Sequence, residues 1–156
     1  MELLGKFGFA VVKWKARHGL RGVAKASDDA KQVALRVGVK DETYAYWYLR
    51  SLGYVFIARN HEPSHAKGEL DLVGFDGETL AFVEVRTRAA AKGKIALPEL
   101  SIGKEKHQVL VRTAHAFLRE RHVKKCPVRF DVVGIDNTPG KPPVVRLHKN
   151  ALSPRA

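Results

Sequence analysis

The chain has 156 residues, 45% of them hydrophobic, which is enough for one globular domain with a single core. Its lone cysteine, Cys126, excludes an internal disulfide and a cysteine-rich zinc cluster, and it fits a reducing, cytoplasmic compartment. The formal net charge of +12 suits a polyanionic partner, and a soluble protein with scattered surface charge is an equal alternative.

Residues 1–14 are mostly apolar, and their spacing predicts an amphipathic helix. The apolar positions are Leu3, Phe7, Ala10, Val11 and Trp14. Lys6 and Lys13 interrupt the segment well short of a bilayer span, and it lacks the basic start and cleavage site of a secretory signal. We therefore expect a cytoplasmic protein without a membrane span.

Three further segments follow before the middle of the chain. A helix is expected from Asp28 to Gly38, and another from an N-cap at Asp41 to Gly53. The apolar stripe of the latter comprises Ala45, Tyr48, Leu49 and Leu52. The β-branched and aromatic residues 54–58 predict a strand.

Residues 68–75 and 79–88 carry the strongest hairpin pattern, with a turn at residues 76–78. A long helix over residues 102–121 and a strand over residues 129–135 are expected next. The tail from Asp136 contains Pro139, Pro142 and Pro143, so it is predicted to be irregular or an edge segment.

The register of this hairpin decides which side chains meet. A turn at residues 76–77 places Asp71 opposite Phe82, whereas a turn at residues 77–78 places it opposite Glu84. In both registers strand alternation separates two faces. One face carries Glu69, Asp71, Glu84 and Arg86, and the other carries Leu70, Leu72, Ala81, Val83 and Val85.

Acidic residues also concentrate around this hairpin. Residues 1–40 hold nine Lys or Arg against three Asp or Glu, residues 41–88 five against eight, and residues 89–156 fourteen against five. Two neighbouring carboxylates need a cation or a proton when buried, and Mg²⁺ or Mn²⁺ suits oxygen ligands. The alternative, which spacing alone favours, is that Asp71 and Glu84 pair with arginines in an ordinary sheet.

An ordered series of motifs runs along the chain: DETYAYWYL (41–49), GY (53–54), RN (59–60), GELDLV (68–73), FVEVRTR (82–88), Lys106 and RFDVV (129–133). In these motifs residues 38–135 resemble the YraN family of uncharacterised bacterial proteins, which is assigned to the PD-(D/E)XK nuclease superfamily and is similar to archaeal Holliday junction resolvases. The resemblance implies an α/β fold with a restriction-endonuclease-like core, a central mixed sheet flanked by helices. That domain would cover residues 38–156, after an N-terminal helical extension over residues 1–37.

The resemblance also implies roles for site residues. Asp71 and Glu84 would bind Mg²⁺ or Mn²⁺, the backbone carbonyl of Val85 would be another ligand, and Glu42 would reach the site from its helix. Helix capping is an equal alternative for Glu42, since an acid in a first turn favours the helix dipole. Glu69 has a weaker claim, because it lies one step further out and could form a salt bridge.

Arg86 departs from the superfamily, which usually places a catalytic lysine there. Arginine supplies charge, but its pKa stays above about 12, so it is a poor base. Three outcomes are open: Arg86 clamps charge, a lysine from elsewhere such as Lys106 substitutes, or catalysis has been lost.

Four basic residues are candidates for phosphate contacts: Arg59, Lys67, Arg88 and Lys106. A basic helix face is more often solvated surface, and Lys106 is favoured because it matches the family. Tyr44, Tyr46, Trp47 and Tyr48 could stack on bases, although core packing is commoner. His61 and His65 flank Pro63, which favours solvated loop histidines over a zinc site.

The expected function is therefore a Mg²⁺-dependent endonuclease that cuts DNA, including branched or structured DNA. One alternative is a nucleic-acid-binding protein that keeps the nuclease fold without turnover. Another is a membrane-surface or partner-binding protein that uses its basic amphipathic N-terminus. Resemblance to resolvases also implies a homodimer, although no stretch of sequence identifies a dimer face.

Overall fold

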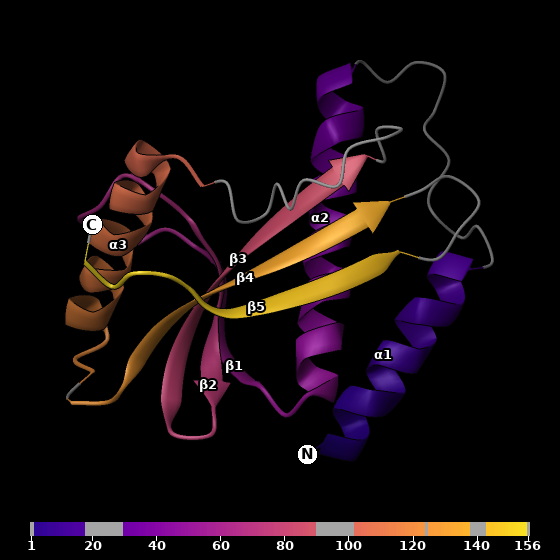
Figure 1. Cartoon of the computed structure of the whole chain (residues 1–156), viewed down its shortest axis with the longest axis horizontal. Helices are drawn as coiled ribbons and strands as arrows, with labels where there is room; N and C mark the ends of the chain where they lie inside the picture. The colour runs from indigo at the N-terminus through magenta and orange to yellow at the C-terminus, as the bar shows by residue number, and fades with distance from the viewer. Residues whose placement is uncertain (1, 18–29, 90–101, 124, 138–142, 156) are drawn as a thin grey trace.

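The computed structural model describes residues 2–17, 30–89, 102–123, 125–137 and 143–155. The described elements are α1 (Glu2–Arg17), α2 (Ala30–Ser51), β1 (Val55–His61), β2 (Leu70–Asp76), β3 (Thr79–Ala89), α3 (Lys104–Glu120), β4 (Val128–Asn137) and β5 (Val144–Leu152). They form a five-stranded sheet with helices on both faces (Figure 1). The predicted α/β class with a central mixed sheet flanked by helices is confirmed.

The strands follow one another across the sheet in the order β1-β2-β3-β4-β5. The first three strands form an antiparallel meander, β4 runs parallel to β3, and β5 is antiparallel to β4. A parallel pair needs a crossover connection, and α3 lies within the one that joins β3 to β4. The tail was predicted to be irregular or an edge segment, and after the prolines it forms the edge strand β5.

Two hydrophobic layers hold the helices against the sheet. The layer beneath α2 contains Tyr44, Ala45, Leu49, Tyr54, Leu72, Ala81, Val83, Val133 and Ile135. The layer beneath α3 contains Leu70, Val73, Leu80, Phe82, Leu110, Val111, Ala114, Phe117 and Phe130. Residues of β3 alternate between these layers. Glu84 lies on the face that carries Leu80 and Phe82, so its side chain is directed toward the α3 layer.

One residue of the hairpin departs from the predicted alternation. Leu72, Ala81 and Val83 share the α2 layer as expected, whereas Leu70 packs in the α3 layer. The β2–β3 pairing ends at Leu72 and Val83, but the β1–β2 pairing continues to Leu70. The first residues of β2 therefore follow β1 and diverge from β3.

Helix α2 is continuous where two helices were predicted. It runs through Gly38, because a single glycine costs a helix only ~1 kcal/mol and no proline accompanies it. The prediction that Asp41 is an N-cap is wrong. Asp41 is instead buried in mid-helix, where its two carboxylate oxygens each accept a hydrogen bond of 2.9 Å from Asn137 Nδ2. The contact ties α2 to the end of β4.

The predicted amphipathic first helix is present as α1, which packs along α2 (Figure 1). Its inner face carries glycine: a Cβ at Gly5 would collide with the Arg50 carbonyl, and one at Gly8 would collide with the Trp47 ring. Phe9 meets the rings of Tyr44 and Tyr48 edge-on. Over the part of the chain that the structure describes, no helix is long and apolar enough to cross a membrane.

A candidate active site between strands β2 and β3

The hairpin takes the second of the two predicted registers. Asp76 pairs with Thr79 and Leu72 with Val83, so Gly77 and Glu78 form the turn. Gly77 has φ +63°, which suits a two-residue hairpin turn. The alternative with the turn at residues 77–78 predicted this register, and its last pair, Leu72 and Val83, directly adjoins Asp71 and Glu84.

The backbone of Val85 lies against Asp71. Its N–H donates a hydrogen bond of 2.7 Å to Asp71 Oδ2, just beyond the point where the β2–β3 pairing stops. In an extended strand the N–H and C=O of one residue point to the same neighbour. The Val85 carbonyl therefore lies on the Asp71 side of β3, and the structure brings the three predicted ligand residues Asp71, Glu84 and Val85 together.

Glu84 is buried, with 3% of its side chain exposed, and two cations approach it. Lys106 Nζ of α3 lies 2.6 Å from Glu84 Oε1, and Arg86 Nη1 lies 3.8 Å from the same oxygen. The Lys106 side chain is 52% exposed, so it reaches the buried acid from the surface of α3. The lysine that the sequence suggested as a substitute for position 86 thus contacts the second acid of the motif.

The surroundings of Asp71 disfavour its ionised form. Burial, and then the neighbouring Glu84, raise the pKa of Asp71 to about 7, while the Val85 N–H and Lys106 oppose the rise. A carboxyl group with this pKa carries a proton for much of the time at neutral pH. A cation bound between the two acids would favour the ionised form and displace that proton.

Glu42 is placed by α2 and adds negative charge at this site. Its charge is among the causes that raise the pKa of Asp71, and its Oε2 accepts a hydrogen bond of 2.5 Å from Asn60 Nδ2. The capping alternative for Glu42 is wrong, because α2 begins at Ala30 and residue 42 lies well inside it. Glu69, by contrast, is exposed.

The donor atoms suit a hard divalent cation. Among the described residues, no three His, Cys, Asp or Glu side chains gather closely enough to hold a metal ion between them. Mg²⁺ needs only one or two carboxylates and takes its remaining ligands from water and phosphate. Asp71, Glu84 and the Val85 carbonyl offer an all-oxygen set, which Mg²⁺ and Mn²⁺ prefer. The residues present therefore fit such an ion.

Gly68 sets the position of this site and was missed by sequence reasoning. A Cβ at Gly68 would lie 2.5 Å from Thr113 Oγ1 and 2.9 Å from Val109 Cγ1 of α3. The backbone that leads into β2 thus runs directly against α3, which brings Asp71 and Lys106 to the same place. The only sequence signal was a glycine immediately before the acidic motif.

Two of the three other predicted phosphate contacts, Arg59 and Lys67, lie on the surface. Arg59 is exposed, stacks 4.3 Å from the Tyr46 ring centre and bonds to Thr43 Oγ1 at 3.3 Å. Lys67 is exposed in the loop between β1 and β2. Arg88 belongs to β3, but its side chain lies outside the described residues.

Tyr44 and His61 make structural contacts. The expectation of solvated loop histidines is wrong for His61, which ends β1, whereas His65 is exposed in the loop that follows. Tyr44 is buried beneath α2, as core packing predicted. His61 Nε2 lies 3.0 Å from Glu120 Oε1, and its ring meets Phe117 edge-on. The Ser64 N–H also donates to Glu120, at 3.1 Å. These contacts fasten the β1–β2 loop to α3.

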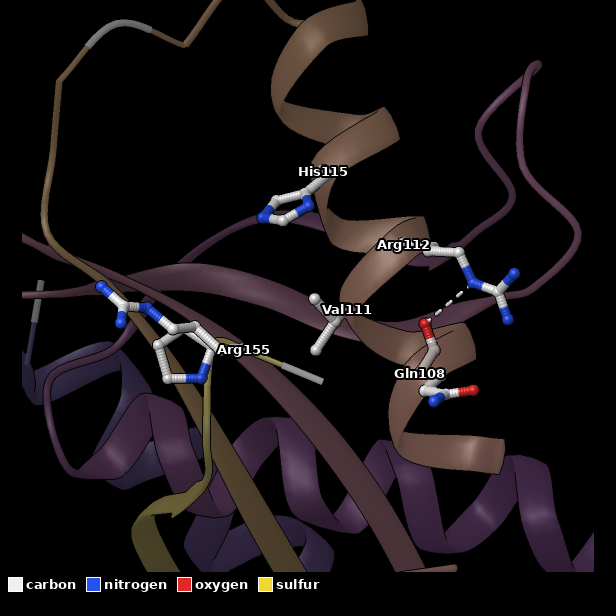
Figure 2. Close-up of a pocket in the computed structure, with 6 residues that line it drawn as sticks. Gln108, Val111, Arg112, His115 and Arg155 are labelled. Carbon is white, nitrogen blue, oxygen red and sulfur yellow. Dashed lines mark hydrogen bonds between the residues drawn. The ribbon is translucent and has the colours of Figure 1, made fainter. Parts of the chain in front are cut away.

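A basic groove of about 460 Å³ lies elsewhere on α3 (Figure 2). It is lined by Gln108, Val111, Arg112, His115, Pro154 and Arg155. His107 Nε2 lies 2.7 Å from the Ser153 carbonyl oxygen, which holds the C-terminal segment against the helix. None of the lining residues belongs to the carboxylate site, so the groove is a separate cationic surface.

Comparison with known proteins places these features in a family context. The family described as "Uncharacterised protein family UPF0102" matches residues 41–135, which include the carboxylate site and Lys106. A UPF0102 protein of Koribacter versatilis is 36% identical over 113 residues, covering 72% of this chain and 77% of that protein. A UPF0102 protein of Marinobacter nauticus is 38% identical over 125 residues, covering 79% of this chain and 97% of that protein.

Proposed function

The chain belongs to the uncharacterised protein family UPF0102, which includes YraN, and on that premise we propose that it is a Mg²⁺- or Mn²⁺-dependent DNA endonuclease of the PD-(D/E)XK superfamily. In this proposal Lys106 replaces the lysine that the superfamily usually carries at position 86. The observation that carries the proposal is the 2.6 Å contact between Lys106 Nζ and the buried Glu84, beside Asp71.

The metal would be held by Asp71, Glu84 and the backbone carbonyl of Val85. When bound, such an ion stabilises charge on the phosphoryl group and lowers the pKa of water. The raised pKa of Asp71 supports this assignment, because burial and the charge of Glu84 outweigh the Val85 N–H and Lys106 at that carboxyl group.

Lys106 and Arg86 would together take the roles of the lysine that the superfamily usually carries at position 86. The ammonium of Lys106 is compact, sits on a flexible stem and is half exposed, so it can move between Glu84 and a bound phosphate. Arg86 lies further from Glu84, at 3.8 Å, where its guanidinium supplies positive charge. Arg86 is then a charge clamp, and Lys106 is the catalytic cation.

The rest of the surface suits a polyanion. The net charge is +12, and Arg112 and Arg155 line a groove on α3 beyond the carboxylates. Arg59 and Lys67 are exposed on the β1–β2 side. Phosphate contacts of this kind position a duplex without reading its sequence, so we expect DNA binding that weakens steeply with salt.

Cleavage assays test the proposal on linear, nicked, flapped and four-way DNA with Mg²⁺ or Mn²⁺. We expect metal-dependent cutting that Asp71→Asn and Glu84→Gln abolish while DNA affinity is kept. Lys106→Ala should lower the rate ~100-fold or more, as expected for loss of a group that acts in the transition state. Lys104→Ala, which removes the same charge two residues earlier on α3, is the matched control and should cut normally.

The same assays separate the alternatives. If Arg86→Ala abolishes cutting and Lys106→Ala does not, the assignment of Lys106 is wrong. If the wild-type protein binds DNA in a salt-dependent way but cuts none of these substrates with either metal, the chain is a binding protein with a nuclease fold.

A further inference from the structure

Helix α1 turns one stripe of apolar side chains away from the protein. Leu3 is 85% exposed and Phe7 71%, and Leu4 and Val11 are exposed beside them. Residues 3, 4, 7 and 11 occupy one face of a helix over successive turns. A single exposed leucine is ordinary, but a continuous apolar stripe on a surface helix indicates a binding surface.

The outward orientation follows from the sequence of the opposite face. Gly5 and Gly8 allow α1 to lie directly on the Arg50 carbonyl and the Trp47 ring, where any side chain would collide. Phe9 completes the contact through Tyr44 and Tyr48. A rotation that buried Leu3 and Phe7 would bring large side chains into the place of these glycines. The helix therefore packs through Gly5, Gly8 and Phe9, and it presents Leu3, Leu4 and Phe7 to solvent.

Basic residues accompany the stripe. Lys6 and Lys13 are both exposed, and at 100° per residue they fall side by side next to the apolar face. The helical segment carries Lys6, Lys13, Lys15 and Arg17 against one acid, Glu2. An apolar face flanked by lysines, on a helix that cannot span a bilayer, is the pattern of a helix that lies in a membrane interface.

We propose that α1 docks this protein on an anionic lipid bilayer, with Leu3, Leu4 and Phe7 inserted among the acyl chains and the lysines at the headgroups. The lipid is favoured over a second copy of the chain for two reasons. Two-fold antiparallel pairing of α1 would bring the lysines of the two copies together, and the exposed stripe comprises four described side chains, whereas a stable interface uses ~20–30 residues a side.

The proposal does not rest on the nuclease assignment. α1 packs on α2, and α2 covers the face of the sheet opposite α3 and Lys106 (Figure 1). Lipid and nucleic acid would therefore meet opposite sides of the molecule, and both could be bound at once.

The test is sedimentation of the full chain with vesicles of phosphatidylglycerol and phosphatidylcholine, compared with vesicles of phosphatidylcholine alone. We expect binding to the anionic vesicles only. Leu4→Gln and Phe7→Gln should each weaken it ~10-fold or more, because each removes an inserted apolar side chain. Lys13→Gln should weaken it roughly fivefold, the effect of one basic residue at an anionic surface.

Val144→Gln is the matched control, because Val144 is also exposed but lies on β5. It should leave vesicle binding unchanged, and thermal unfolding should show that all four variants are folded. Failure of the wild-type chain to sediment with anionic vesicles overturns the proposal, as does an equal loss with Val144→Gln. Light scattering that shows a dimer which Phe7→Gln dissociates also overturns it, in favour of a second copy as the occupant.

Discussion

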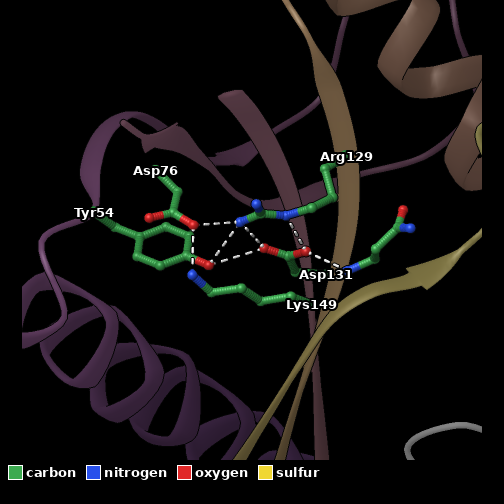
Figure 3. A network of polar contacts seen from close by, with 6 residues as sticks. Tyr54, Asp76, Arg129, Asp131 and Lys149 are labelled. Atoms are coloured by element: carbon green, nitrogen blue, oxygen red, sulfur yellow. Dashed lines mark hydrogen bonds and ion pairs between the residues drawn. The ribbon is translucent and has the colours of Figure 1, made fainter. Parts of the chain in front are cut away.

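Two groups of acids lie on the same sheet, and their negative charge is compensated to different degrees by the side chains around them. One is the carboxylate site of Asp71 and Glu84. The other, which we call the Asp131 network, comprises Tyr54, Asp76, Arg129, Asp131 and Lys149 (Figure 3). Both oxygens of the buried Asp131 are fully engaged. Oδ1 accepts from Arg129 Nε at 2.7 Å and from the Asn150 N–H at 2.8 Å, and Oδ2 accepts from the Tyr54 hydroxyl and Arg129 Nη2, each at 2.9 Å.

The pKa values of Asp76 and Asp71 shift in opposite directions, which distinguishes the Asp131 network from the carboxylate site. Burial alone would raise the pKa of Asp76, but hydrogen bonds from Lys149 and Arg129 lower it below its usual value. At the carboxylate site, burial and Glu84 raise the pKa of Asp71 to about 7 in spite of the Val85 N–H and Lys106. Burial of acids is therefore no sign of function by itself. Incomplete compensation is the feature that indicates a ligand.

The largest expected effect is loss of the Asp131 network. Asp131→Ala would leave the Arg129 guanidinium and the Tyr54 hydroxyl without their buried acceptor, which typically costs ~3–5 kcal/mol of unfolding free energy. Urea denaturation measures the loss. Asp71→Asn is the control from the other group, and it should not destabilise the metal-free protein. Equal losses for the two variants would remove the distinction between the groups.

The pH dependence of stability should have opposite signs in the two groups. The pKa of Asp71 is raised on folding, so the folded state binds more protons, and the unfolding free energy falls as pH rises from about 4 to about 7. The pKa of Asp76 is lowered, so its contribution is present at neutral pH and is lost as pH falls through its folded value.

Urea titrations in chelator across this range would measure both slopes. Asp71→Asn should remove the fall toward neutral pH and make the metal-free protein more stable than the wild type near pH 7. Adding Mg²⁺ should stabilise the wild type and leave the variant unchanged, since only the former keeps both acids. A wild-type slope that persists in Asp71→Asn would mean that another group titrates.

Gly68→Ala tests whether the site depends on close contact with α3. The added methyl would meet Thr113 Oγ1 and Val109 Cγ1, and overpacking of this kind typically costs ~1–3 kcal/mol. Thermal unfolding measures the cost, and metal-dependent cleavage should fall with it because Asp71 and Lys106 move apart. The double variant Gly68→Ala, Thr113→Ala should recover part of both. Absence of any recovery would assign the loss to backbone strain at φ +154° instead.

Local patterns of the sequence predicted the acids but not what surrounds them. Alternation along the hairpin put Asp71 and Glu84 on one face. The choice between two turns stayed open, because Asp76-Gly77 and Gly77-Glu78 both suit a tight turn. The approach of Lys106 to Glu84 depends on how α3 packs against Gly68, more than forty positions away, which no short-range pattern encodes.

The two helices at the N-terminus were each predicted only in part. Gly38 was predicted to end a helix, but a single glycine costs a helix only ~1 kcal/mol and α2 continues through it. In α1 the periodicity correctly predicted an amphipathic helix, yet an apolar stripe does not state which face packs inward. The pair Gly5 and Gly8 was the available signal, since small residues on one face allow close approach of another backbone.

The smallest expected effect on stability comes from a matched pair of lysines. Lys149 Nζ lies 2.6 Å from Asp76 Oδ2 with its side chain 50% exposed, and Lys106 lies at the same distance from Glu84 with nearly the same exposure. Exposed ion pairs contribute ~0.2–1 kcal/mol, so Lys149→Ala should cost little, and high salt should erase the cost. Asp76 keeps its contact with Arg129 in that variant. Distance and exposure alone would therefore predict the same role for the two lysines. The acids beside them differ, because the pKa of Asp71, next to Glu84 and Lys106, is raised, whereas that of Asp76, next to Lys149, is lowered. Lys149→Ala should cut DNA at the wild-type rate and Lys106→Ala should not, and similar cleavage rates for the two variants would show that the difference between the two acid groups has no catalytic meaning.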